Sequence, residues 1–342
     1  NRLGIHVLYG ILFYKEALML GLFRPAPLGV DLGSGSLKVI ELKAKKISIA
    51  AFIDIPPSER EVVDSTLREE TLLVNRLRSF FKELNILGRE AAVQVPGNLS
   101  FIRTITLPPM PKSELKEAVK WEIKRQLPYP PEEAVYDYVA TEIADGIAVT
   151  FASVERKNIH RHLFPFKEAG LNVVAVDATP LCLIRTLPVH GSGNVIVLDI
   201  GSRNMEINIV KSGSLRLTRS VEMGGEHIKS HLLDEGFSEA EATDILMEGP
   251  AEKMKEILNQ FLKEIFRSID YYKATFKEKT FSEVILTGGV AINNAARDYF
   301  SHMFDIPVSV PNPFDNLIMK NEGLRPLGPR FSVAIGLARR AV

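Results

Sequence analysis

Two aspartates end apolar stretches of the sequence, and each opens a short turn rich in glycine and serine. Asp31 is followed by Leu-Gly-Ser-Gly-Ser, and Asp199 by Ile-Gly-Ser. Glycine lets a backbone turn tightly so that consecutive N–H groups point at one anion, while serine hydroxyls and Lys38 add donors and a positive charge. Two carboxylates that face each other suit a hydrated Mg²⁺, which binds through few protein groups. The pattern therefore predicts a phosphate site in which Asp31 and Asp199 hold Mg²⁺ through water.

Two diglycines lie farther along the chain, each at the start of a helical pattern. Gly224-Gly225 precedes a helix expected from His227, and Gly288-Gly289 follows an apolar strand. A diglycine lets backbone lie flat against a nucleotide, and a helix N-terminus favours anions. Tight packing of strand against helix would explain Gly224-Gly225 equally well, so its role stays open. The four turns together predict these ATP contacts: Gly33, Ser34, Gly35, Ser36, Lys38, Gly201, Ser202, Arg203, Gly224, Gly225, Glu226, Lys229, Gly288, Gly289 and Val290.

The elements that carry these turns are repeated, because residues 28–50 and 196–218 read alike at a fixed offset. Each copy starts with an apolar strand that ends at the Asp-x-Gly-Ser turn, and two more strands follow across short turns. Alternating apolar residues and turn residues at hairpin positions predict a three-stranded β-meander in each copy. An apolar stripe of helical spacing follows each meander, within residues 73–84 and 254–272. The sequence therefore predicts an α/β protein of two lobes, each built as βββαβα, with a cleft between them.

Residues 100–169 have no counterpart in the second copy. They read as a strand at 102–107, a proline-bounded helix at 113–127 and two strands at 136–140 and 147–151. We interpret them as a small inserted α+β subdomain. The expected organisation is an N-terminal extension 1–27, a first lobe 28–99 and 170–190, the insertion 100–169, and a second lobe 191–342 with a C-terminal helix.

Composition excludes some classes of partner. Lys plus Arg equals Asp plus Glu at 42 each, and this balance argues against a nucleic-acid partner, which usually calls for a basic excess. The single cysteine, Cys182, cannot form an intramolecular disulfide, which fits a reducing compartment.

The first residues are not expected to cross a membrane. Arg2, Lys15 and Glu16 interrupt or flank the apolar stretch within residues 3–23, which falls short of the ~20 apolar residues that a bilayer requires. No convincing signal-peptide cleavage site follows it. Met19 is a plausible start of the protein. Residues 1–18 would then be an amphipathic interfacial helix or an uninformative upstream extension.

The turns also resemble those of a known superfamily. Residues 31–38 resemble the first phosphate loop of actin, including the lysine seven positions after the aspartate. Residues 199–202 are similar to its second phosphate loop, and residues 286–290 to its adenosine motif. This order is typical of the superfamily of actin, heat-shock chaperone ATPases and sugar kinases. The resemblance implies an actin-like, ribonuclease H-like duplicated fold that binds ATP with Mg²⁺.

Within that superfamily, the chain resembles the PilM family of type IV pilus assembly proteins over residues 22–342. The most specific strings are residues 28–42, 114–130 and 331–338. The resemblance implies a cytoplasmic scaffold that is peripheral at the inner membrane. Its expected partner is the N-terminal peptide of a PilN-like inner-membrane protein. Other pilus-assembly components and a homo-oligomer stay open.

The partner peptide is expected to dock in a groove that includes the insertion, which resembles that of the division protein FtsA. If this carries over, Trp121 and Tyr129 lie near the groove. The alternative for Trp121 is a position in the hydrophobic core.

Two departures from the superfamily pattern weaken the case for fast ATP hydrolysis. Arg203, Asn204 and Met205 stand where many relatives have glycine and threonine, and Thr179-Pro180 stands where chaperone ATPases offer a carboxylate. No catalytic residue is identified, so an enzyme with at most slow ATPase activity is expected. The alternatives are an active ATPase or small-molecule kinase, or a division or type II secretion scaffold. These scaffolds would add a membrane helix, which is not expected after the last core helix.

Overall fold

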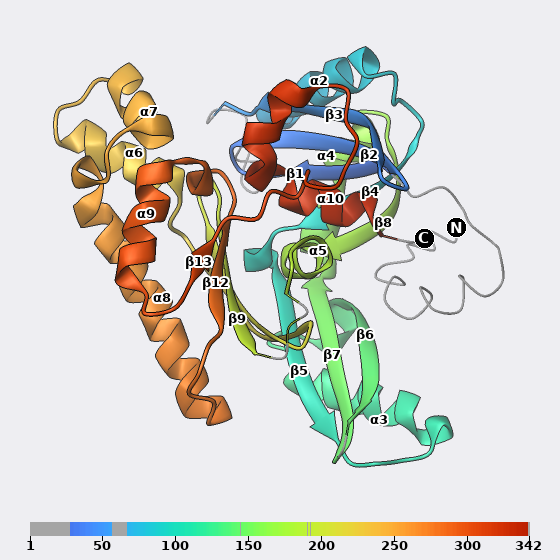
Figure 1. The fold of residues 1–342 in the computed structure, drawn as a ribbon. Helices are drawn as coiled ribbons and strands as arrows, with labels where there is room; N and C mark the ends of the chain where they lie inside the picture. The colour runs from blue at the N-terminus through green and yellow to red at the C-terminus, as the bar shows by residue number, and fades with distance from the viewer. Residues whose placement is uncertain (1–27, 57–66, 144, 190, 192, 341–342) are drawn as a thin grey trace.

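The structure of the protein is a computed structural model that describes residues 28–56, 67–143, 145–189, 191 and 193–340. These residues form two lobes and a smaller subdomain that projects from the first lobe (Figure 1). Within this part of the chain, no helix is long and apolar enough to cross a membrane. The expected N-terminal extension, residues 1–27, lies outside the described residues.

The first lobe contains a five-stranded sheet of order β3-β2-β1-β4-β8. Strands β1, β2 and β3 form the predicted antiparallel meander, while β4 and β8 run parallel to β1. Helices α2 and α4 cover the sheet, and Phe81 and Phe166 are buried in the cluster between them. The elements of this lobe are β1 (Leu28–Leu32), β2 (Ser36–Lys43), β3 (Lys46–Asp54), α2 (Leu67–Glu83), β4 (Glu90–Val95), α4 (Arg156–Glu168), β8 (Asn172–Ala178) and α5 (Thr179–Thr186).

The second lobe repeats this arrangement with a sheet of order β11-β10-β9-β12-β13. The long helix α8 follows the meander, and its apolar stripe, including Phe261, Ile265 and Tyr272, is buried against the sheet. The elements are β9 (Asn194–Ile200), β10 (Met205–Lys211), β11 (Ser214–Val221), α6 (Gly225–Asp234), α7 (Glu239–Glu248), α8 (Lys255–Phe276), β12 (Glu283–Thr287), α9 (Asn294–Met303) and β13 (Val308–Ser309). The last helix, α10 (Ser332–Ala338), packs on β1 and β2 of the first sheet.

The first turn of each meander is closed by the same backbone hydrogen bond. The Gly33 N–H donates to the Ser36 carbonyl at 3.0 Å, and the Gly201 N–H donates to the Asn204 carbonyl at 2.9 Å. The likeness of the two turns in sequence therefore reflects one backbone conformation used twice. The predicted duplication of the fold is confirmed.

Helices α5 and α10 lie between the two large sheets and join the cores of the lobes. Cys182 of α5 and Leu337 of α10 share one buried cluster with Ala92 of the first sheet and Val197 of the second. The C-terminal helix that the sequence indicates is thus a central element of the core.

The insertion is a three-stranded sheet of order β5-β7-β6 with one helix, α3, packed on it. Val119 and Ile123 of α3 are buried against Val149 and Phe151 of β7. The opposite face of the sheet points toward the lobes, where the Thr104 hydroxyl donates to the Leu215 carbonyl at 2.8 Å. The elements are β5 (Ser100–Leu107), α3 (Lys112–Gln126), β6 (Ala134–Ile143) and β7 (Gly146–Glu155).

Helix α4, which the sequence analysis grouped with the insertion, packs in the core of the first lobe. Its buried residues Ile159, Leu163 and Phe166 belong to the same cluster as the apolar face of α2. In the second lobe, α9 lies between β12 and β13 as α4 lies between β4 and β8. By its packing, α4 is part of the repeat, and the separate sheet is confined to residues 100–155. The sequence did not reveal that α4 belongs to the repeat, because the insertion interrupts the βαβ unit immediately before this helix.

Candidate functional site

The four turns singled out from the sequence surround one cleft of about 1330 Å³ between the lobes. All the residues predicted to contact ATP or Mg²⁺ line it, with the exception of Gly224. A Cβ atom on Gly224 would lie 2.5 Å from the Ser202 carbonyl oxygen, so this residue packs against the second turn. The alternative of tight packing, left open for this diglycine, therefore describes Gly224, whereas Gly225 faces the cleft.

The first turn holds a buried ion pair at the floor of the cleft. Lys38 Nζ lies 3.1 Å from Asp31 Oδ2 and 3.3 Å from the Ser36 carbonyl oxygen. The two charged side chains are only 11% and 7% exposed, so each depends on the other for its charge balance. The Lys38 ammonium is thus already directed at the backbone of the turn, where a phosphate would bind.

The two phosphate turns touch each other across the cleft. The Arg203 N–H donates to Ser34 Oγ at 3.1 Å, and a Cβ atom on Gly35 would lie 2.7 Å from the Cβ of Ser202. Ser202 Oγ in turn donates to Glu226 Oε1 at 2.9 Å. Only glycine fits at position 35 with the lobes at this separation. The two turns are therefore in direct contact at this point of the cleft.

Two carboxylates of the second lobe share the floor of the cleft. The pKa of Asp199 is raised from 3.8 to about 7, first by burial and then by the nearby Glu206 and Asp31 carboxylates, against a lowering by Lys38. Burial also raises the pKa of Glu206 to about 6. Within the part of the chain that the structure describes, the buried Glu206 Oε2 has no hydrogen-bond partner. Paired acidic groups with an unsatisfied oxygen fit a divalent cation such as Mg²⁺.

Glu206 is a residue that sequence reasoning passed over. It is the register partner of Asp199 in the second meander, as Lys38 is the partner of Asp31 in the first. The seven-residue spacing that singled out Lys38 is repeated between Asp199 and Glu206. That signal was present in the sequence, but the change from lysine to glutamate concealed it.

Gln94 and Arg330 also line the cleft and were not predicted. Gln94 is the last residue but one of β4, and its Nε2 donates to the Leu32 carbonyl at 2.7 Å. Its buried Oε1 has no hydrogen-bond partner among the described residues. Arg330 comes from the segment before α10, and its Nη2 donates to Ser36 Oγ at 3.2 Å. No sequence signal links positions so far apart, since only the fold brings them together.

Among the described residues, the end of β8 and the segment after it offer no unpaired carboxylate to the cleft. Asp177 is buried and paired with Arg185 at 2.5 Å and with Arg340 at 3.3 Å. Thr179 lines the cleft, and its hydroxyl donates to the Val95 carbonyl at 3.3 Å. Asp177 thus serves the packing of α5 and α10 against the sheet.

Trp121 and Tyr129 of the insertion have different environments. Trp121 is 65% exposed on the face of α3 opposite Val119 and Ile123, and Arg125 stacks over its ring at 5.6 Å. The alternative of a core position for Trp121 is thereby excluded. Tyr129 is half-buried, and its hydroxyl donates to Ser153 Oγ at 2.7 Å. Burial raises the pKa of this tyrosine, so it stays neutral.

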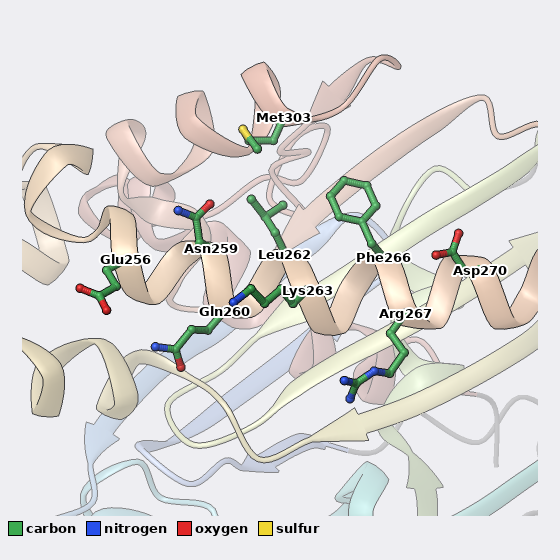
Figure 2. A pocket seen from close by; sticks show the side chains of 9 residues that line it. All are labelled: Glu256, Asn259, Gln260, Leu262, Lys263, Phe266, Arg267, Asp270 and Met303. Carbon is green, nitrogen blue, oxygen red and sulfur yellow. The ribbon is translucent and has the colours of Figure 1, made fainter.

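A second pocket, of about 830 Å³, lies on the outer side of the second lobe between α8 and α9. Figure 2 shows Leu262 and Phe266 of α8 directed toward Met303 of α9. None of the residues predicted from the sequence to bind a ligand lines this pocket. The predicted chemistry is therefore concentrated in the cleft between the lobes.

Comparison with known proteins agrees with this architecture. The family model described as Type IV pilus assembly protein PilM matches residues 29–342. None of the curated proteins matches the sequence. Among solved structures, a PilM-PilN type IV pilus biogenesis complex is similar with a TM-score of 0.79 and 21% identity, covering 92% of this chain and 97% of that chain.

A second similar structure is the ethanolamine utilization protein EutJ from Carboxydothermus hydrogenoformans. It has a TM-score of 0.58 and 16% identity, and the match covers 95% of this chain and 94% of that chain. At such identities the structural likeness concerns the fold, and the predicted actin-like, two-lobed fold is confirmed.

Proposed function

Because the chain belongs to the PilM family of type IV pilus assembly proteins, we propose that it is a nucleotide-binding scaffold of pilus assembly. It holds ATP with Mg²⁺ between its lobes and presents the insertion to the N-terminal peptide of a PilN-like inner-membrane protein. The observation that carries the proposal is the convergence of both phosphate turns and Gly288-Gly289 on one cleft.

The cleft residues divide into those for phosphate, cation and nucleoside. The backbone of the first turn and the Lys38 ammonium receive the phosphates, with Ser202 and Arg203 closing over them from the other lobe. Asp31, Asp199 and Glu206 hold Mg²⁺, directly or through water. The cation neutralises phosphate charge when it is bound. Gly225, Glu226 and Lys229 of α6, with Gly288, Gly289 and Val290, border the remainder of the cleft, where the nucleoside lies.

The same geometry favours a scaffold over an efficient enzyme. Rapid hydrolysis requires a base or a polarising group that positions a water in line with the phosphate. Asp177 cannot take that role, since Arg185 and Arg340 pair with it away from the cleft. Gln94 can orient a water but cannot accept its proton at neutral pH. Bound ATP therefore acts mainly as a ligand that fixes the lobes relative to each other.

The insertion supplies the partner surface. Among the described residues, the second lobe has no corresponding subdomain. We infer that nucleotide binding between the repeated lobes does not require the insertion. Its exposed Trp121 and its half-buried Tyr129 are of the residue types that anchor interfaces. A PilN-like partner would place this protein in the cytoplasm, peripheral at the inner membrane.

Two titrations test the proposal. Calorimetry should show binding of ATP with Mg²⁺, and a fluorescent synthetic peptide of the first residues of a PilN-like protein should gain anisotropy with the protein. The peptide should bind equally well with a non-hydrolysable ATP analogue. Absence of ATP binding at millimolar concentration would refute the nucleotide role, and absence of peptide binding in the ATP-bound protein would refute the scaffold role.

A further inference from the structure

Arg330 places a guanidinium group at the first phosphate turn. Its Nη2 lies 3.2 Å from Ser36 Oγ and 3.2 Å from Asp54 Oδ1, and its guanidinium carbon is 4.9 Å from the centre of the Phe52 ring. The side chain is only 21% exposed. The aromatic face and two polar contacts therefore fix the direction of a cation that lines the cleft.

The residue before Arg330 is bonded to the other lobe. The carbonyl of the preceding residue, Pro329, accepts hydrogen bonds from the Gly288 N–H at 3.1 Å and from the Thr287 hydroxyl at 3.0 Å. These two donors belong to the turn of the second lobe that carries Gly288-Gly289. Arg330 thus connects the diglycine turn of one lobe to the phosphate turn of the other.

Two cations converge on Ser36 from opposite groups of that residue. Lys38 Nζ contacts its carbonyl oxygen, and Arg330 Nη2 contacts its hydroxyl. Lys38 is balanced by a buried partner, Asp31, whereas the Asp54 side chain that balances Arg330 is 74% exposed. An ion pair with an exposed partner is weak, because water screens the charges. Arginine–phosphate hydrogen bonds are charge-assisted, often bidentate and roughly twice as strong as neutral ones.

From this geometry we propose that Arg330 is a ligand of the nucleotide polyphosphate. Without nucleotide, Asp54 holds the Arg330 side chain in place, and the phosphates displace Asp54 when they bind. The inference rests on the proposed binding of ATP in the cleft. Pro329 bonds to the second lobe and Phe331 is buried against β2 and β3 of the first, so Arg330 lies at the junction of the lobes and a phosphate bound to it lies there too. Arg330 then makes the cleft selective for nucleoside polyphosphates over the nucleoside itself.

Calorimetric titration with ATP, ADP and adenosine tests this role. Arg330→Gln should lower the affinity for ATP and ADP roughly 10- to 100-fold, as expected for loss of a charged hydrogen bond, and leave adenosine binding unchanged. Arg330→Lys should recover part of the loss, because it keeps the charge without the planar fork. Asp54→Asn should raise the ATP affinity about two- to fivefold, because the competing carboxylate is removed.

Arg325→Gln is the matched control. Arg325 lies on the same segment, but it pairs with Glu322 and donates to the Phe314 carbonyl outside the cleft. Its replacement should leave the affinity for all three ligands unchanged. Unchanged ATP affinity in Arg330→Gln, or an equal loss for ATP and adenosine, would overturn the inference while the proposed function stands. If the wild-type protein binds no ATP at all, both fail together.

Discussion

Lys38 and Glu206 occupy the same position of the two repeats but carry opposite charges. Each is the register partner of an aspartate at the end of a strand, Asp31 or Asp199. Duplication gives the two positions the same backbone geometry, and the two side chains differ in charge. We propose that the lysine faces phosphate, while the glutamate adds a carboxylate to the cation site.

Replacement of Lys38 by alanine should weaken the binding of ATP with Mg²⁺ by roughly 1.5–3 kcal/mol, the usual contribution of a hydrogen bond to a charged group. The buried Asp31 loses its partner at the same time, so melting curves must show that the variant is folded at the temperature used. Lys43→Ala is the control, because Lys43 lies on the same strand with its side chain 69% exposed. Equal calorimetric affinities of wild type and Lys38→Ala would contradict the site assignment.

Asp137 predicts how stability depends on pH. Burial raises its pKa from 3.8 to about 6, and Asp177 of β8 adds to the increase against the opposing effects of the Tyr138 N–H and Arg340. Because the folded-state pKa lies above the ordinary value, the folded protein keeps a proton that the unfolded chain releases. The free energy of unfolding therefore falls as pH rises from about 4 to about 6, and stays lower above that range.

The variant Asp137→Asn should remove this dependence. We expect it to be about 1 kcal/mol more stable than wild type at pH 7.5, after allowance for partial exposure, and equally stable near pH 4. Denaturant unfolding at the two pH values measures the difference. Asp145→Asn, at an exposed turn between β6 and β7, serves as control. A variant that is less stable than wild type at pH 7.5 would show that the charged form of Asp137 contributes favourably.

At the level of elements, the position of each turn decides what its residues can do. Gly288 and Gly289 follow the same strand, yet their surroundings differ. Gly288 has a φ of 88°, and a Cβ atom there would lie 2.5 Å from Asp199 Oδ1 and from the Ile200 carbonyl oxygen. Gly289 is in the right-handed helical region, and a Cβ atom there would meet no atom within 4 Å.

The two alanine variants of this turn should therefore separate folding from binding. Gly288→Ala should destabilise the protein by about 1–3 kcal/mol, because it combines a left-handed backbone with a close contact. Gly289→Ala should leave the melting temperature of the ligand-free protein unchanged but lower the affinity for ATP, since the added methyl group projects into the cleft. Thermal melting and calorimetry distinguish these effects. If Gly289→Ala binds ATP as wild type does, the nucleoside does not lie against this turn.

Helix α3 presents one face to its sheet and the opposite face to solvent. Trp121→Ala should change stability by less than about 0.5 kcal/mol, because the ring is 65% exposed. It should weaken binding of the PilN-like peptide by about 1–2 kcal/mol if the ring is an anchor. Lys120→Ala, the adjacent exposed residue, is the control for a change of surface. Peptide binding that is unaffected in Trp121→Ala would place the groove on another side of the insertion.

On the scale of the whole molecule, α5 and α10 join the cores of the two lobes, and the cleft lies between these lobes. We expect ATP to stabilise the fold by about 2.7 kcal/mol at a hundredfold excess over the dissociation constant, through mass action alone. The melting temperature should rise equally with ATP and with a non-hydrolysable analogue. Phosphate release should remain far below the rates of ordinary enzymes, so steady turnover of several per second would contradict the scaffold role.

The sequence determined the duplicated architecture and most of the nucleotide site, because both depend on local chemistry that is written twice. A strand that ends in Asp-x-Gly-Ser, and a diglycine before a helix, require particular residue types at fixed spacing. These turns line one cleft in the structure, and α3 begins and ends within one residue of its expected bounds. Asp31 and Asp199, each at the end of a strand before such a turn, line the same cleft.

Tertiary structure decided the rest, because side chains distant in sequence meet only once the chain has folded. Arg330 reaches Ser36 across 294 positions, and no periodicity encodes that contact. Helix α4 joins the first lobe because its buried residues complete the cluster of α2, although the insertion separates it from the rest of the repeat. From the sequence alone, the Trp121 side chain could lie in the core or on the surface. Its exposure follows from Val119 and Ile123, which turn the other face of α3 toward the sheet.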